Sequence, residues 1–496
     1  MGKTSILITT EGTYPFYPGG VSVWCDQTVR HLTDFRFHVF AITHSPTQPL
    51  RYRIPANVES LVTMPLWGTE EPGFPATAVS AAHRRKSQTN DAVIREKFLP
   101  AFEAALCAFR CPRTNPETLA EALLQLQDYS AHFDYARSVT SPEAWQIFLD
   151  GYVRRSQPED RLNLEEATIC MRWLARYLGV LTVPYPPVDV VHSSMAGLAG
   201  IAGVLGKLRH GSAFLLSEHG LHLRELYLWL GRTPYSVRCR RFLLRFHEAI
   251  VRMNYWFADE VTCLGQFNKS WQMKLGANPD KVRVIPNGVD PALFSPRPAG
   301  PRSRPTVLTM ARISPLKGID VLIRAIALVR ERVPEIELRI MGDVADTAYH
   351  AECLRIIEEH CLENHVSFGI TNESHLMYNQ ADVFCLASLT EGMPFSVLEA
   401  MMSGCPVVAT DVGNVAEMLG ETGLLAKPNN AQSLARALLE LMDGAGARER
   451  RERLAQSALM RAREHYTLRG ATGQYRRIYQ SLTYAAQTTA CAGSAD

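Results

Sequence analysis

The stretch that decides the fold is Glu391-Gly392-Met393-Pro394-Phe395-Ser396-Val397-Leu398-Glu399. The apolar run before it, residues 382–388, predicts a buried strand. After it, residues 400–403 continue a helix that Gly404 ends, and residues 405–410 predict the next strand. This order of strand, loop, helix and strand is typical of an open parallel sheet. Ligands of such sheets bind at the carboxyl ends of the strands, where residues 389–394 would lie.

Two features of this stretch suit a nucleotide diphosphate-sugar. Pro394 suits the first helical position, and the free amides of Phe395 and Ser396 after it would favour an anion. Glu391 lies in the loop beside that position, and Glu399 lies about 7 Å farther along the helix axis. Diphosphate at the helix start, with sugar hydroxyls on Glu391 and ribose hydroxyls on Glu399, fits this layout. A loop glutamate and a helix glutamate that both face solvent are the alternative.

Two cations follow another predicted strand in the same half of the chain, at residues 306–310. Arg312 and Lys317 lie between that strand and a helix, where they suit a diphosphate, although ordinary surface cations would look the same. Residues 296–305 hold several prolines among Gly and Arg, and they predict a linker between two domains.

The first half of the chain opens with a similar unit. Residues 5–10 predict a buried strand, a Gly-rich loop ends at Gly19-Gly20, and a helix and a second strand, residues 37–42, follow. A glycine pair at a strand-to-helix turn lets a phosphate or sugar approach the backbone, so Gly20 is a candidate donor-binding residue. A plain tight turn is the alternative.

Strand signals are absent between residues 68 and 184, where the sequence is helical, charged and aromatic, and we interpret it as a helical insertion. Strands return at residues 188–194 and 213–217. His192 and His219 are expected at the ends of these strands, on the edge that faces the ligand. Several arginines between residues 238 and 252 indicate either a solvated helix face, which we favour, or a basic surface for anionic lipid or an acceptor.

The spacing of Glu391 and Glu399 resembles the E-x7-E signature of the retaining glycosyltransferases of family 4. The loop Glu11-Gly12-Thr13-Tyr14-Pro15, with 18–22 after it, closely resembles the cytoplasmic Pel-type glycosyltransferases of exopolysaccharide machinery. This resemblance implies an α/β fold of the GT-B class, with two Rossmann-like doubly wound domains that face a cleft. The expected domains are residues 1–298, on the acceptor side with the insertion at about 68–184, and residues 299–472, which bind the nucleotide sugar. A final helix, at about 473–485, packs back onto the first domain.

The resemblance also assigns roles to residues. Glu391 and His219 are the expected catalytic residues, which hold the donor sugar, and Arg312 and Lys317 bind the leaving diphosphate. Asn414 stands where the family commonly has a second glycine, and we expect it to tolerate the same left-handed backbone. The expected reaction moves a sugar, with retention, from a nucleotide diphosphate-sugar to a saccharide hydroxyl, with UDP as the expected nucleotide.

The bulk composition fits a soluble enzyme of two or three domains. The 496 residues carry a net charge of only +2, so we expect no nucleic-acid partner, and the 11 scattered cysteines are typical of a reducing cytosol. No Asp-x-Asp pair follows a strand, and we expect neither a metal nor a cofactor. The resemblance implies a cytoplasmic protein at the surface of the inner membrane, beside an exopolysaccharide export complex. A nucleotide-sugar epimerase of the same fold and a non-catalytic subunit of a membrane assembly are the rival functions.

Overall fold

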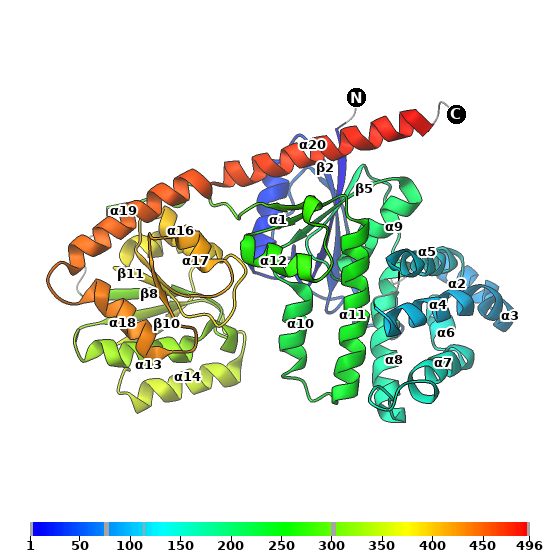
Figure 1. Ribbon diagram of the computed structural model, residues 1–496, viewed down its shortest axis with the longest axis horizontal. Helices are drawn as coiled ribbons and strands as arrows, with labels where there is room; N and C mark the ends of the chain where they lie inside the picture. Colours follow the sequence, from blue (N-terminus) through cyan, green and yellow to red (C-terminus); the bar gives the residue numbers. More distant parts are fainter. Residues whose placement is uncertain (1–2, 74–78, 113–114, 299–303, 494–496) are drawn as a thin grey trace. The chain divides into compact units, whose positions relative to one another are not determined.

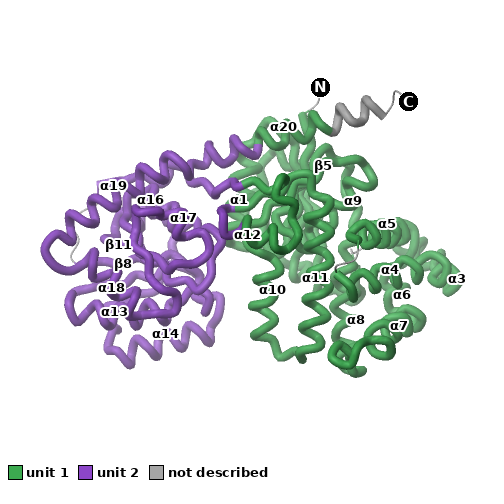
Figure 2. The backbone as a smooth tube through the Cα atoms, viewed as in Figure 1, with its two compact units in different colours: residues 1–263, 269–283, 476–496 green, residues 264–268, 284–475 purple. Residues whose placement is uncertain are grey.

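Two separate parallel sheets form the core of the protein, as a computed structural model shows (Figure 1). The structure describes residues 3–73, 79–112, 115–298 and 304–493. It divides into two compact units (Figure 2). Unit 1 holds residues 1–263, 269–283 and 476–496, and unit 2 holds residues 264–268 and 284–475.

The sheet of unit 1 has the strand order β3-β2-β1-β4-β5-β6-β7. Its central strands are buried at almost every position because helices cover both faces, as in other doubly wound sheets. β1, for example, is buried from Ser5 to Thr10. The strands are β1 (Ser5–Glu11), β2 (Arg36–Thr43), β3 (Val58–Pro65), β4 (Val190–Ser193), β5 (Ala213–Glu218), β6 (Glu260–Cys263) and β7 (Val282–Val284).

Helices pack around this sheet and connect its strands. The sheet helices of unit 1 are α1 (Gly20–His31), η4 (Leu198–Gly200), α9 (Ile201–His210), α10 (His222–Leu230), α11 (Val237–Phe257) and η5 (Pro279–Lys281). The helix α12 (Gln266–Lys274) begins in unit 2 and continues in unit 1. At Gly203 of α9 a Cβ would lie 2.2 Å from the Phe214 ring, so the glycine lets this helix approach β5 closely.

The segment between β3 and β4 is helical in the described residues. Phe98, Phe102 and Phe109 are buried at helical spacing, so the aromatic residues of this segment form its own core. Its helices are α2 (Val79–Gln88), α3 (Asp91–Val93), η1 (Ile94–Phe98), α4 (Leu99–Arg110), α5 (Pro116–His132), α6 (Tyr135–Val139), α7 (Pro142–Leu149), η2 (Asp150–Arg154), α8 (Leu164–Leu178) and η3 (Gly179–Thr182). Residues 74–78 and 113–114 of the predicted insertion lie outside the described residues.

The sheet of unit 2 has the order β10-β9-β8-β11-β12-β13, and its strand pairs are parallel. The predicted α/β class with two doubly wound domains is therefore confirmed. The strands are β8 (Thr306–Met310), β9 (Glu337–Met341), β10 (Val366–Gly369), β11 (Val383–Leu386), β12 (Val407–Thr410) and β13 (Leu424–Ala426).

The helices of unit 2 bury apolar stripes against this sheet. In α13, Ile319, Leu322, Ile323 and Ile326 recur at the spacing of one helix face and are fully buried. The helices are η6 (Pro315–Lys317), α13 (Ile319–Arg330), α14 (Thr347–Glu359), α15 (Ser374–Met377), η7 (Tyr378–Gln380), α16 (Phe395–Met402), α17 (Val415–Leu419), α18 (Ala431–Met442), α19 (Ala447–His465) and α20 (Leu468–Gly493). None of the described helices is long and apolar enough to cross a lipid bilayer.

The boundary between the units falls earlier than the proline-rich linker, of which residues 299–303 lie outside the described residues. Residues 284–298 belong to unit 2 because they pack on it. The Asn287 side chain donates to the Met393 carbonyl at 3.0 Å, and the Val289 amide donates to the Tyr466 carbonyl at 2.9 Å. At the other end of the chain, α20 begins in unit 2 and continues into unit 1, where Tyr479 is buried and hydrogen-bonded to His192.

Candidate active site

The predicted donor-binding residues of unit 2 lie at the carboxyl edge of its sheet. Arg312 and Lys317 follow β8, and the loop with Glu391 follows β11 and leads into α16. Since parallel strands end at the same edge, these loops come from neighbouring strands and meet there. β11 pairs directly with β8, which places the two loops next to each other.

Lys317 and Glu391 form an ion pair at this edge. Glu391 Oε1 accepts hydrogen bonds from Lys317 Nζ at 2.5 Å and from Ser388 Oγ at 2.6 Å. Both charged side chains are largely enclosed, with 23% of the lysine side chain and 11% of the glutamate side chain exposed. The sequence analysis gives these two residues separate tasks, diphosphate and sugar, and it does not identify Ser388. In the structure the two residues are in direct contact, and the positive charge of Lys317 neutralises the negative charge of Glu391.

Two glycines in left-handed conformations let the loops approach so closely. Gly413 has φ +59°, and a Cβ there would lie 1.9 Å from the Glu391 carbonyl oxygen. Gly318, with φ +58°, would place a Cβ 2.2 Å from the Ala387 carbonyl oxygen. Any larger residue at Gly413 would displace the Glu391 loop, so this glycine is part of the candidate site.

Asn414, which we expected to tolerate a left-handed backbone, does not adopt one. Its φ is −97°, and it precedes α17 as the N-cap residue. Its side chain instead connects two segments of unit 2: Nδ2 donates to the Gly392 carbonyl at 3.0 Å, and Oδ1 accepts from the Phe267 amide at 3.1 Å. An amide side chain can make hydrogen bonds that a glycine cannot, and here those bonds hold the Glu391 loop.

The start of α16 also differs by one residue from the prediction. Pro394 is the N-cap residue, with ψ 124°, and the helix begins at Phe395. The Val397 amide makes a bond back to the Pro394 carbonyl at 3.2 Å, so the amides of Phe395 and Ser396 precede the hydrogen bonds of the helix. These two amides can still bind an anion, as predicted for the helix start.

Glu399 is partly buried one turn farther along α16. Its Oε2 accepts a hydrogen bond from the Tyr378 hydroxyl at 2.6 Å, and burial raises the pKa of the Glu399 carboxyl from 4.5 to about 7. Tyr378 is fully buried and belongs to η7, 21 residues earlier in the chain. The sequence analysis does not identify this partner, because nothing in the local pattern distinguishes a tyrosine of the core from one that binds a carboxylate.

In unit 1, the candidate residues lie at the carboxyl ends of β1 and β5. Gly20 is the first residue of α1, and Gly19 before it has a φ of +153°, which favours glycine. Glu11, the last residue of β1, accepts a hydrogen bond from the Leu198 amide at 3.0 Å, and burial raises its pKa to about 7. Glu11 is not among the predicted site residues, although it is the acidic residue that ends the first strand.

His219 and His192 have different environments. His219 follows β5, is 7% exposed and packs on the Trp24 ring with centroids 4.4 Å apart. Neither of its ring nitrogens has a hydrogen-bond partner among the described residues, and burial lowers its pKa to about 3. It is therefore a neutral imidazole that can donate one bond to a ligand and accept another.

His192 lies within β4 rather than at the ligand-facing edge, so the expectation that both histidines lie there is wrong. Its Nδ1 is bonded to the Tyr479 hydroxyl at 2.7 Å, and its Nε2 is bonded to the Ser217 hydroxyl at 2.6 Å. Because both nitrogens are engaged inside the sheet, His192 has a structural role.

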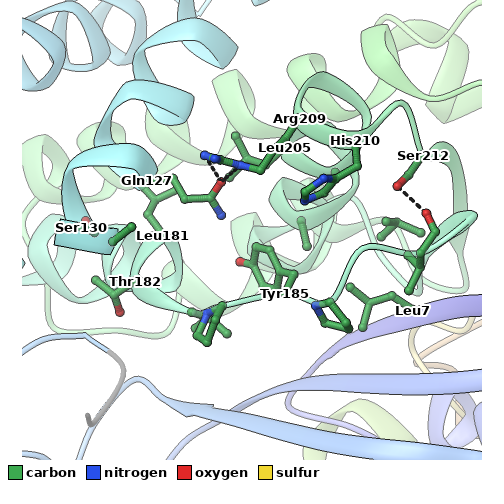
Figure 3. A pocket seen from close by; sticks show the side chains of 18 of the residues that line it. Leu7, Gln127, Ser130, Leu181, Thr182, Tyr185, Leu205, Arg209, His210 and Ser212 are labelled. Carbon is green, nitrogen blue, oxygen red and sulfur yellow. Dashed lines mark hydrogen bonds between the residues drawn. The ribbon is translucent and has the colours of Figure 1, made fainter. Parts of the chain in front are cut away.

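A cavity of about 340 Å³ lies in unit 1 at the amino ends of the sheet strands (Figure 3). Val188 and Ser212, which precede β4 and β5, line it together with Arg209 and Gln127. Two of the polar side chains have partners within the lining: Arg209 donates to Gln127 Oε1 at 3.1 Å, and Ser212 donates to the Val188 carbonyl at 2.6 Å. The cavity lies at the amino ends of these strands, whereas the candidate site residues lie at the carboxyl ends.

The described residues contain no group of three or more His, Cys, Asp or Glu side chains that could hold a metal ion.

Residues 4–280, more than half of the chain, match the family described as domain of unknown function DUF3492. The chain belongs to the DUF3492 family. In this DUF3492 protein, residues 295–460 match a second family, glycosyl transferases group 1, and this match covers most of unit 2.

Relatives of known name match this DUF3492 protein over part of their length. It is 32% identical over 221 residues to the MMP alpha-(1->4)-mannosyltransferase of Mycolicibacterium hassiacum, which is 43% of this chain and 51% of the relative. It is 33% identical over 177 residues to the putative colanic acid biosynthesis glycosyltransferase WcaL of Escherichia coli, which is 33% of this chain and 43% of the relative. The chain thus spans about half the length of these relatives.

Solved structures share the whole fold. Anabaena HepE in complex with UDP aligns with a TM-score of 0.60 at 15% identity, over 96% of this chain and all of HepE. Sucrose-phosphate synthase from Thermosynechococcus elongatus aligns with a TM-score of 0.61 at 19% identity, over 97% of this chain and all of that chain. These neighbours have the GT-B fold, so the predicted GT-B class of this DUF3492 protein is confirmed.

Replacing Gly413 by alanine should destabilise unit 2 and displace the Glu391 loop. The left-handed backbone and the contact with the Glu391 carbonyl together should lower the free energy of unfolding by about 2–4 kcal/mol. Gly444→Ala is the matched control, because Gly444 has φ +81° but no atom within 4 Å of its Cβ position. The free energy of unfolding of that variant should fall by only about 1 kcal/mol. Equal losses in urea denaturation would show that the close approach at Gly413 is not needed.

Stability should fall as the pH rises through the titration of Glu399. The pKa of this carboxyl is about 7 in the folded protein and 4.5 ordinarily, so between these two pH values the folded state holds a proton that the unfolded state releases, and stability is lost over that window. Glu399→Gln stays neutral and can still accept from Tyr378. It should therefore gain on the order of 2 kcal/mol relative to the wild type at about pH 8, but not at about pH 5.

Urea denaturation at both pH values measures this difference. Glu363→Gln, at an exposed position of the same unit, is the control and should change stability equally at both. A Glu399→Gln effect that does not depend on pH would contradict the assignment of a raised pKa to this carboxyl.

Proposed function

We propose that this DUF3492 protein is a retaining glycosyltransferase, which moves a hexose from a UDP-sugar to a saccharide hydroxyl. The observation that carries the proposal is the enclosed Lys317–Glu391–Ser388 cluster beside the amino end of α16. A cation, a carboxylate and two free amides at one edge of a parallel sheet suit the charges and hydroxyls of a nucleotide sugar. Two comparisons support a nucleotide sugar as the substrate: most of unit 2 matches the glycosyl transferases group 1 family, and HepE was solved in complex with UDP.

In unit 2, we propose that the diphosphate binds Arg312, Lys317 and the amides of Phe395 and Ser396. A phosphate group would compete with Glu391 for the Lys317 ammonium, so donor binding would loosen the ion pair and free Glu391 to accept from a sugar hydroxyl. The ion pair therefore keeps both side chains in place before the donor arrives, which reduces the ordering that binding requires.

We propose that Glu399 accepts hydrogen bonds from the ribose hydroxyls. Its carboxyl has a pKa of about 7 without ligand, so it is partly protonated at neutral pH. Hydroxyl donors stabilise the ionised form of a carboxylate. Nucleotide binding should therefore be linked to the release of a proton from Glu399.

The chemistry assigned to these groups is substitution at the anomeric carbon with retention. The bond between this carbon and the diphosphate oxygen breaks, and a bond to the acceptor oxygen forms on the same face of the sugar. The acceptor proton passes to the leaving diphosphate. Arg312, Lys317 and the α16 amides take up the charge that develops on the leaving group. The neutral imidazole of His219 and the carboxylate of Glu391 are proposed to hold the sugar in the geometry of attack.

The proposed biological role is exopolysaccharide synthesis on the cytoplasmic side of the inner membrane, beside an export complex. Two observations support it: the loop at residues 11–22 resembles that of the Pel-type glycosyltransferases, and WcaL, which matches part of this chain, is described as a putative colanic acid biosynthesis glycosyltransferase.

Calorimetric titration with UDP, alongside turnover with a UDP-sugar, should separate the roles of these residues. Arg312→Ala removes a charged partner of the diphosphate and should weaken UDP binding by about 2 kcal/mol or more. Glu391→Gln should keep UDP affinity or raise it, because Lys317 loses its competing carboxylate, while turnover falls about ten- to a hundredfold. His219→Ala should behave like Glu391→Gln.

Arg324→Ala serves as the control, since Arg324 lies on α13, away from the loops at the end of β8. If Arg312→Ala binds UDP normally, the proposed position of the diphosphate is wrong. A second outcome would favour a non-catalytic subunit instead. In that case the protein binds UDP, but neither the wild type nor any variant releases free nucleotide from a panel of UDP-, ADP- and GDP-sugars.

Turnover should persist when divalent metal ions are removed. The proposal assigns the charge of the leaving diphosphate to Arg312, Lys317 and helix amides, so EDTA should change the rate less than about twofold. A rate that EDTA abolishes and added magnesium restores would contradict this assignment.

A further inference from the structure

The helix α10 of unit 1 leaves apolar side chains exposed to solvent. All nine of its residues are described, and Leu230 is the one that is buried. Tyr227 is 66% exposed, Leu228 38% and Trp229 45%. The helix packs against α11, and Val237, the first residue of α11, is 66% exposed as well (Figure 1). Consecutive exposed large apolar residues on a helix indicate a surface that binds something.

The surface region around these exposed residues also includes part of α8, whose side chains contact α10 and α11. Trp173 of α8 contacts the Trp229 ring with centroids 6.2 Å apart, and its indole nitrogen donates to the Tyr235 hydroxyl at 3.2 Å. At the start of α8, Glu166 pairs with Arg238 at 3.9 Å, two residues after the exposed Leu164. We call this surface the α10–α11 tip. It consists of Leu164, Tyr227, Leu228, Trp229, Arg232, Val237 and Arg238.

Two arginines, Arg232 and Arg238, lie on this tip, and more lie nearby along α11, where Arg241 and Arg245 both pair with Asp160. Residues 222–245 contain six arginines and one glutamate, whereas the whole chain has a net charge of only +2. Residues 159–172, which pack against them, add four carboxylates and two arginines, so an excess of three positive charges remains. Arg232 is exposed at the turn between the two helices.

We propose that the α10–α11 tip docks on the surface of an anionic lipid membrane. Tyrosine and tryptophan rings favour the interface between lipid headgroups and hydrocarbon, and leucine and valine side chains gain by leaving water. Arginines beside them pair with anionic headgroups while their stems cover apolar surface. The tip combines these residue types within two helix ends and the turn that joins them.

The composition of the tip favours lipid over a saccharide. A sugar stacks on the flat faces of aromatic rings, but Leu164, Leu228 and Val237 offer no such face and are exposed beside the rings. A protein partner would need complementary acidic groups, whereas an anionic membrane supplies negative charge at every position of the tip. The inference does not depend on the proposed sugar transfer, since lipid binding requires no nucleotide.

Sedimentation with vesicles tests the proposal. The protein should bind vesicles of phosphatidylglycerol and phosphatidylcholine at least about tenfold more tightly than it binds pure phosphatidylcholine vesicles at low salt. The double variant Tyr227→Ser and Leu228→Ser should weaken this binding about a hundredfold. Arg232→Glu should weaken it about tenfold and reduce its dependence on salt.

Two variants of the same unit serve as matched controls. Trp256→Ser removes an exposed tryptophan near the other end of α11, and Arg477→Glu reverses an exposed arginine on α20. Both should bind vesicles like the wild type. UDP affinity and the melting temperature should be unchanged in all four variants, which separates loss of docking from loss of folding or of donor binding.

Three outcomes would overturn the proposal. The wild type could fail to bind either kind of vesicle, or the tip variants could bind like the controls. The tip variants could also lose affinity for an oligosaccharide acceptor while vesicle binding is absent, which would identify the tip as an acceptor surface.

Discussion

Parallel strands that are buried on both faces leave few places where this chain can bind a polar ligand. The centres of β1 and β11 are apolar because helices cover them, so charged side chains are displaced to the loops at the strand ends. All the strands of one sheet run in the same direction, and therefore the loops that follow them lie at one edge. The candidate residues of each unit, Arg312, Lys317 and Glu391 in one and Glu11 and His219 in the other, follow this rule.

The detailed geometry of unit 2 depends on how closely its loops approach. Gly413 contacts the Glu391 backbone and Gly318 contacts the end of β11, and each approach excludes a Cβ. Asn414 then fixes the loop with hydrogen bonds from its side chain. The result is a short ion pair between Lys317 and Glu391 in an enclosed place, where a charge without a partner would be costly.

Much of the fold can be predicted from the sequence, and the residues that escape prediction do so for physical reasons. The central strands have long apolar runs, whereas β3 and β13 lie at sheet edges, are short or partly polar, and have no such signal. The loop positions of Arg312 and Glu391 follow from the order of strands and helices. Tyr378 and Ser388 are found only in three dimensions, because a hydrogen bond to a carboxylate leaves no local pattern. His192 was misplaced because a position near a strand end does not say which way the side chain points or what it bonds.

The chain passes between the two units more than once, so a single cut in the gene cannot separate them. Residues 264–268 belong to unit 2, although the residues on either side of them belong to unit 1. Phe267 donates to the Asn414 side chain that holds the Glu391 loop, and Gln266 donates to Glu417 at 2.8 Å. A gene cut at the proline-rich linker would leave these partners on the other fragment. A chain recombined at the linker would therefore carry Asn414 and Glu417 without the hydrogen-bond partners that residues 264–268 of the original chain supply.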